Sequence, residues 1–259
     1  TRRSSDLNRL GKTGKSVPTV DLLYVRGFWI LSIFVGLFTL FLSGTRGAFL
    51  GLITGLIVFS VGYIKWGNKD IVLKLVRVSV ACIVILGLVA LIINRNGLVG
   101  GVRGGDNVVS RVVSTGINDA SFQGRISSLT LGLKGFSKKP LMGWGPENFT
   151  IAYDRYLTPE IAAQSTSSFD QAHNKIVEEL TTKGIVGLVF YLSIWGAAIY
   201  ILFKNLKNQN KGHRIFTLLI GSALIGYFVQ NLFLFDTPGT IGQFIIMMAF
   251  VTWIEIGKG

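Results

Sequence analysis

Six long stretches without an ionisable side chain dominate this 259-residue sequence. Each contains 17 to 21 consecutive residues free of Asp, Glu, Lys and Arg, and each is rich in Leu, Ile, Val and Phe. A helix needs about 20 apolar residues to cross the hydrocarbon core of a bilayer, within a range of about 17–25. The sequence therefore predicts an all-α integral membrane protein with about six transmembrane helices. The stretches are residues 27–45, 47–64, 78–94, 184–203, 215–235 and 237–254.

The net charge of +13 is concentrated in the short connections between these stretches. With six spans, the short segments 1–26, 65–77 and 204–214 and the C-terminal end fall on one side of the membrane. Together they carry 15 basic and 4 acidic residues, and the positive-inside rule assigns that side to the cytoplasm. The opposite side holds the long segment 95–183, with ten basic and eight acidic residues. The excess charge therefore reflects membrane topology, and we expect no binding of nucleic acid.

This topology divides the chain into four parts. The long segment is expected to be extracytoplasmic, to carry the catalytic motifs and to contain short amphipathic helices. The four parts are a cytoplasmic basic segment (1–26), three transmembrane helices (27–94), the extracytoplasmic loop (95–183) and three further transmembrane helices (184–256).

Two amphipathic helices are expected in the extracytoplasmic loop. The first covers residues 125–136, where Ile126, Leu129, Leu133 and Phe136 recur at helical spacing and define one apolar face. The second starts with Asp170 as its cap, carries His173 in its first turn and is closed by Gly184.

Small residues and the single cysteine have structural interpretations. Gly47, Gly51 and Gly55 recur at four-residue intervals, a spacing that lets another transmembrane helix approach closely. Gly221 and Gly226 are expected to serve the same purpose. Cys82 is expected to be a small buried side chain. No Cys/His cluster indicates a metal, and we expect neither a metal nor a cofactor.

The candidate chemistry lies on the side of the long loop. His173 follows Asp170 by three residues, and that carboxylate could orient the ring or raise its basicity. Arg46 and Arg125 each offer a guanidinium fork that matches phosphate oxygens. The alternative for His173 is a structural role, and for Arg46 it is snorkelling to the membrane interface. His213 lies in a basic cytoplasmic loop and is expected to be solvated.

Three groups of short motifs occur between residues 40 and 200. They are SGTRGA at 43–48, GR at 124–125 followed by PLMGWG at 140–145, and HN at 173–174 followed by EL at 179–180 and GIVGL at 184–188. In order and spacing they resemble the motifs of the O-antigen ligase and polymerase family.

The resemblance implies a membrane glycosyltransferase on the extracytoplasmic face of the inner (cytoplasmic) membrane. It would transfer or polymerise glycan from an undecaprenyl-diphosphate-linked donor onto the hydroxyl of an acceptor glycan or lipid. Arg46 and Arg125 would bind the diphosphate, and His173 would act as general base on the acceptor or orient it. Asp170 and Asn174 would support His173. Family members have more spans, so the chain is expected to correspond to the C-terminal part of one.

The diphosphate is already a good leaving group, and no Asp-x-Asp pair is present to bind a metal, so the transfer is expected to be metal-independent. The acceptor distinguishes a polymerase, which we favour, from a ligase or a protein O-glycosyltransferase. One alternative is a transporter or flippase, but such proteins place ionisable groups near the bilayer midplane, and all six predicted spans lack them. Another is a non-catalytic scaffold, which would tolerate the loss of His173.

Overall fold

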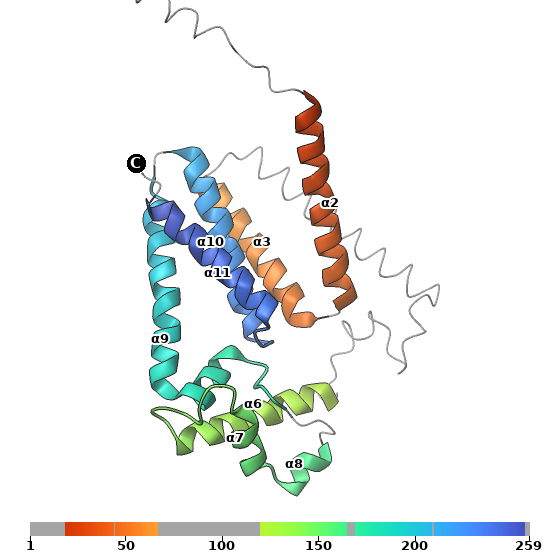
Figure 1. Cartoon of the computed structure of the whole chain (residues 1–259), viewed down its shortest axis with the longest axis vertical. Helices are drawn as coiled ribbons and strands as arrows, with labels where there is room; N and C mark the ends of the chain where they lie inside the picture. Colours follow the sequence, from red (N-terminus) through yellow and green to blue (C-terminus); the bar gives the residue numbers. More distant parts are fainter. Residues whose placement is uncertain (1–18, 44, 67–119, 165–168, 209, 257–259) are drawn as a thin grey trace, which may run out of the picture. The chain divides into compact units, whose positions relative to one another are not determined.

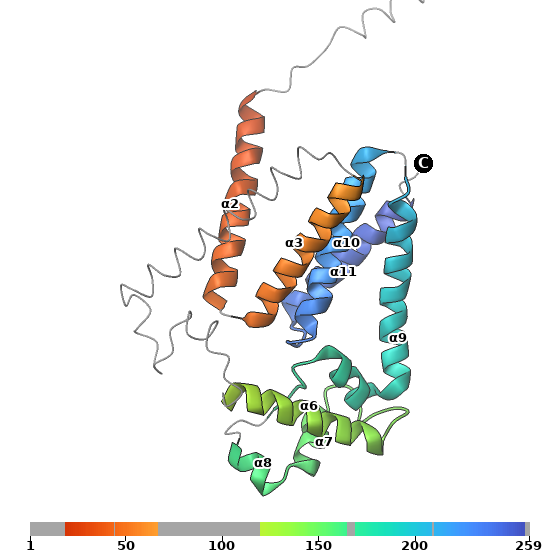
Figure 2. The ribbon, with the colours of Figure 1, turned by 180° about the vertical axis from the view of Figure 1, so that it is seen from behind.

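The computed structural model describes residues 19–43, 45–66, 120–164, 169–208 and 210–256 (Figures 1 and 2). Every element in these ranges is an α-helix, as predicted. The third predicted span, residues 78–94, and residues 95–119 of the predicted loop lie outside the described ranges. The helices are α2 (Thr19–Ser43), α3 (Arg46–Trp66), α6 (Ala120–Lys138), α7 (Phe149–Tyr156), α8 (Pro159–Gln164), α9 (Lys175–Asn205), α10 (Lys211–Asn231) and α11 (Pro238–Ile256).

Four of these helices, α3, α9, α10 and α11, are long and apolar enough to cross a membrane. Large apolar side chains on them face outward: Phe190 of α9 is 68% exposed and Ile245 of α11 is 60% exposed. Such exposure suits a lipid environment, in which the surroundings of a helix are as apolar as its side chains. The chain is therefore a multi-pass membrane protein.

Among the described residues, helix α2 forms a unit separate from the rest of the chain. It is 25 residues long and includes an apolar stretch, Tyr24–Leu40. Phe28, Trp29 and Ile30 are all more than 60% exposed. A helix that is hydrophobic on all sides belongs in a protein core or a membrane, which agrees with the predicted first span.

Helices α3 and α10 lie side by side along their glycines (Figures 1 and 2). A Cβ atom added at Gly51 would stand 2.5 Å from the carbonyl oxygen of Gly226, and one added at Gly226 would stand 2.7 Å from the carbonyl oxygen of Gly51. A Cβ at Gly55 would stand 3.1 Å from the carbonyl oxygen of Ser222. The predicted packing role of this glycine series is confirmed. Gly221 differs, because it faces the side chain of Leu202 on α9 at an ordinary 3.5 Å.

The Gly51 contact predicts the effect of a single methyl group. Gly51→Ala would force two backbones apart and should lower the free energy of unfolding by about 1–3 kcal/mol, the usual cost of overpacking. Gly196→Ala in α9 is the matched control, because a Cβ there meets nothing within 4 Å. The measurement is thermal unfolding of the detergent-solubilised variants. A Gly51→Ala protein as stable as the control would show that the two helices do not approach this closely.

At one end of the bundle lies the lobe, which we define as α6, α7, α8, the turn 139–148 and residues 169–183 (Figure 1). The lobe has its own core of Leu131, Phe149, Tyr153, Ala172 and Val177. Arg46 at the start of α3 and the turn between α10 and α11 are at this lobe end. The Lys204–Glu255 ion pair and the start of α10 are at the far end.

The face of α6 that is buried in the protein is formed mainly by small residues. Ile126 and Leu133, on the predicted apolar face, are 44% and 46% exposed and are not part of the face buried in the protein. The small residues beside them are buried because they allow the helix to lie close to α7 and α9. The buried residues of α6 are Gly124, Ser127, Ser128, Leu131, Gly132 and Gly135.

Candidate active site around His173

Helix α9 is broken at Gly184, and the turn 139–148 fills the break. Gly184 has φ 68° and ψ −167°, which interrupts the helix where the sequence predicted its end. In an unbroken helix the Ile185 N–H would donate to the Thr181 carbonyl. Here Ile185 donates to the carbonyl of Pro140 (2.8 Å), and the Thr181 carbonyl accepts from the N–H of Trp144 (3.0 Å). The turn thus satisfies the backbone groups that the break releases.

Glycine is required on both sides of this junction. Gly143 has φ 64°, and a Cβ there would stand 2.5 Å from the backbone carbon of Thr182. A Cβ at Gly184 would stand 2.2 Å from the carbonyl oxygen of Leu141. The two glycines explain why PLMGWG and GIVGL occur together in this sequence: the turn and the break form one joint.

The start of α9 differs from the prediction. Asn174, not Asp170, is the N-cap: its Oδ1 accepts from the N–H groups of Ile176 (3.0 Å) and Val177 (3.1 Å). His173 therefore precedes the helix, and the prediction that it shares a helical turn with Asp170 is wrong. The Nδ2 of Asn174 donates to the carbonyl of Leu232 (3.0 Å), beyond the end of α10. This contact makes Asn174 the better cap, because it satisfies the helix start and joins it to the bundle.

The imidazole of His173 is held between two aromatic rings. The rings of Phe169 and Phe235 meet it edge to face, with centroids 5.5 Å and 5.0 Å away. Its Nδ1 lies 3.2 Å from the carbonyl oxygen of Gln171. A carbonyl only accepts, so this contact assigns the proton of the neutral ring to Nδ1 and the lone pair to Nε2.

Burial lowers the pKa of His173 below its ordinary value of 6.5, and the nearby charge of Arg125 lowers it further. The Gln171 carbonyl and Asp170 act in the opposite direction but do not outweigh these effects. Asp170 itself is exposed. The ring is therefore neutral at pH 7, the form in which Nε2 accepts a proton.

The two predicted arginines belong to the same end of the molecule. Arg125, half-buried in α6, is close enough to His173 to act on its charge. Arg46 is the half-buried first residue of α3. A Cβ on its neighbour Gly47 would stand 2.9 Å from the Cβ of Phe233, in the same turn as Phe235, which meets the His173 ring.

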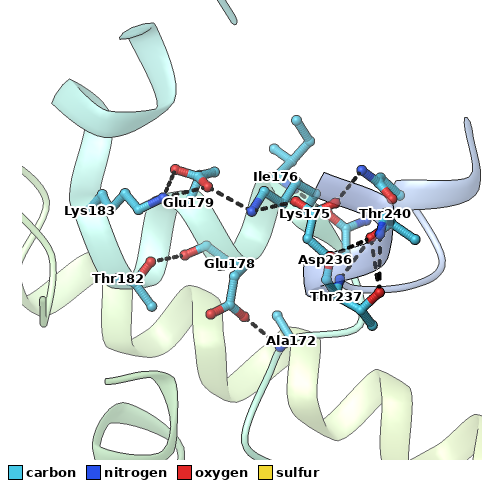
Figure 3. A network of polar contacts seen from close by, with 12 residues as sticks. Ala172, Lys175, Ile176, Glu178, Glu179, Thr182, Lys183, Asp236, Thr237 and Thr240 are labelled. Atoms are coloured by element: carbon cyan, nitrogen blue, oxygen red, sulfur yellow. Dashed lines mark hydrogen bonds and ion pairs between the residues drawn. The ribbon is translucent and has the colours of Figure 1, made fainter. Parts of the chain in front are cut away.

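A polar network at the start of α9 was not predicted (Figure 3). Lys175 lies between Asp236 (2.8 Å) and Glu179 (3.1 Å), and Glu179 also pairs with Lys183 (2.7 Å). Asp236 further accepts from the Tyr227 hydroxyl (2.5 Å). Burial alone would raise the pKa of Asp236, but the hydrogen bonds from Lys175 and Tyr227 outweigh burial and lower it. The charged Asp236 therefore fastens the turn that carries Phe235 to the start of α9.

His213 is also placed differently from its prediction. Its Nε2 lies 3.0 Å from Oδ1 of Asn205, whose Nδ2 donates to Glu255 (2.8 Å). The ring is half-buried and not simply solvated. It belongs to a polar cluster at the far end of the bundle.

These features define a multi-pass membrane protein with a lobe at one end of its helix bundle and a neutral histidine at their junction. The O-Antigen ligase family model matches residues 31–192, more than half of the chain. The chain belongs to the O-antigen ligase family.

The matched residues include all three sequence motifs. A relative from Haemophilus influenzae, described as an uncharacterized protein, is 24% identical over 230 residues. That match covers 86% of this chain and 56% of the relative, so the chain spans a little over half of the relative's length.

Proposed function

We propose that this chain forms the transfer site of a membrane glycosyltransferase that moves glycan from a polyprenyl-diphosphate donor, undecaprenyl diphosphate, to an acceptor hydroxyl. The observation that carries the proposal is the state of His173: neutral, with Nδ1 bound to a carbonyl and with Arg125 nearby. Membership of the O-antigen ligase family supports glycan as the transferred group.

In the proposed step, Nε2 of His173 takes the proton of the acceptor hydroxyl. The oxygen of that hydroxyl attacks the anomeric carbon of the donor glycan. The bond from that carbon to the diphosphate oxygen breaks, and the diphosphate leaves with the bonding electrons. Arg46 and Arg125 bind the diphosphate and stabilise the negative charge that grows on it. The step needs no redox partner, and we expect it to proceed without a metal ion.

The distribution of charge supports a site on the extracytoplasmic side of the cytoplasmic membrane. Lys204 in the last turn of α9 and Lys211 at the start of α10 lie at the far end of the bundle, opposite the lobe. The positive-inside rule places that far end in the cytoplasm. The lobe and His173 would then face the extracytoplasmic side.

Transfer kinetics of arginine variants test the diphosphate site. We expect Arg46→Gln and Arg125→Gln each to lower kcat by about 10²–10³-fold, because each removes a donor aimed at developing charge. Arg155→Gln is the control, since Arg155 is exposed on α7 and lies over the ring of Trp144. The assay uses fluorescent lipid-diphosphate glycan, with and without EDTA. Arginine variants as active as the control would remove the diphosphate clamp from the proposal.

The pH profile tests the role of His173 separately. Transfer should fail as pH falls through the pKa of the ring, so the acid limb of kcat/KM should lie below 6.5. Arg125 lowers this pKa and Asp170 raises it. The acid limb should therefore shift to higher pH in Arg125→Gln and to lower pH in Asp170→Asn. Shifts in one common direction would show that the limb belongs to another group.

The products distinguish the possible acceptors. A ladder of products in repeat-sized steps identifies a polymerase, which is the outcome we expect. A single transfer to an added lipid or peptide acceptor identifies a ligase or a protein O-glycosyltransferase.

A further inference from the structure

The short turn that carries His173, residues 169–174, needs support from its surroundings. His173 has φ 51°, in the left-handed region that residues with a Cβ rarely adopt. Such a conformation persists only where neighbouring groups hold it. On the helix side, Asn174 caps α9 and bonds to Leu232. The other side is held by a residue to which the sequence motifs assign no role.

That residue is Glu178, in the first turns of α9 (Figure 3). Its Oε2 accepts a hydrogen bond of 2.7 Å from the backbone N–H of Ala172. Ala172 is fully buried in the core of the lobe. The carboxylate therefore reaches back past the helix start and fixes the backbone immediately before His173.

The peptide unit that Glu178 holds is the one that orients the histidine. The N–H of Ala172 and the carbonyl of Gln171 belong to the same planar group, so fixing one end fixes the other. The Gln171 carbonyl accepts from Nδ1 of His173 (3.2 Å) and from the hydroxyl of Ser128 on α6 (3.3 Å). A continuous chain of contacts thus runs from the Glu178 carboxylate through one peptide unit to the imidazole.

Hydrogen bonds in such a chain polarise one another. A side-chain oxygen that accepts from the N–H makes the carbonyl of the same peptide a better acceptor. A better acceptor keeps the proton on Nδ1 and leaves Nε2 basic. The sequence suggested Asp170 for this support, but Asp170 is exposed and Gln171 provides the oxygen that Nδ1 meets.

We propose that Glu178 is a positioning residue for His173, acting through the Gln171–Ala172 peptide to fix the tautomer and direction of the ring. The proposal rests on the proposed function of His173 as the base. It assigns Glu178 no contact with substrate. The arrangement needs a side chain at position 178 that accepts a hydrogen bond from the Ala172 N–H. Glutamine can accept this bond and should preserve the position of His173, whereas methionine should not.

The experiment compares Glu178→Gln, Glu178→Met and the control Glu160→Met, an exposed glutamate on α8 in the same lobe. We expect Glu178→Met to lower kcat by between about tenfold and about a hundredfold at unchanged donor KM, the scale expected when a reacting group is displaced. Glu178→Gln should stay within about threefold of wild type, because its side-chain oxygen still accepts. A wild-type kcat for Glu178→Met, or equal losses in both variants, would overturn the proposal.

A second readout does not depend on activity. The chain has only two histidines, so His213→Gln leaves His173 as the single ring to observe by nitrogen NMR in detergent. We expect the Nδ1–H tautomer in this background and with Glu178→Gln, and a mixture of tautomers with Glu178→Met. An unchanged spectrum in Glu178→Met would overturn the proposal. If the wild-type protein transferred no glycan, the proposed function would fail while this spectrum still decided the role of Glu178.

Discussion

Replacing His173 with glutamine should lower kcat for glycan transfer by about 10²–10⁴-fold, the usual contribution of a positioned general base. Glutamine occupies a similar volume between the rings of Phe169 and Phe235 but cannot take a proton at neutral pH. The loss should appear in kcat more than in the KM of the lipid-linked donor, because the diphosphate is assigned to the arginines. The measurement is steady-state transfer by purified protein in detergent.

The second histidine supplies the control. His213→Gln changes a half-buried ring at the far end of the bundle, so transfer should stay within about threefold of wild type, as for substitutions remote from chemistry. Equal activity of His173→Gln and wild type would remove His173 from the mechanism. Another group would then have to take the proton of the acceptor hydroxyl.

Gly184→Ala should produce the largest loss of stability. Its φ of 68° and ψ of −167° fall in a region that is essentially restricted to glycine. An added Cβ would also stand 2.2 Å from the Leu141 carbonyl, a backbone atom that cannot move aside cheaply. Conformational strain and overpacking together should cost about 3 kcal/mol or more.

Thermal unfolding and the yield of monodisperse protein measure this effect. Gly242→Ala in α11 is the matched control, because a Cβ there meets nothing within 4 Å. Since the joint at Gly184 holds the lobe against α9, Gly184→Ala should also abolish transfer. A variant that keeps wild-type stability would contradict the break in α9.

Much of the architecture follows from local sequence. Runs without charge predict spans because an ionised side chain in hydrocarbon is costly at any position along a helix. Gly184 was predictable as a helix end because glycine commonly takes positive φ there. The close packing of Gly51 could be inferred from the four-residue spacing of small residues alone.

The details of the candidate site depend on contacts between distant segments. Asp170 and Asn174 are both good helix N-caps by residue type. The contact of Asn174 with Leu232, 58 residues away, cannot be inferred from the neighbouring sequence. The pairing of Lys175 with Asp236 depends in the same way on where the α10–α11 turn lies. On α6, the apolar period through Ile126 did not indicate which residues are buried in the protein, because close approach to α7 and α9 favoured small side chains.

The most direct test of the account is to follow transfer and donor cleavage together in purified protein, with EDTA present. The donor is a defined lipid-diphosphate glycan, and the acceptor is either a second donor or an added lipid. The account predicts one released lipid diphosphate for each glycan transferred by the wild-type protein, and neither product from His173→Gln. Well-folded protein that transfers nothing with several donors and acceptors, or transfer that persists in His173→Gln, would contradict it.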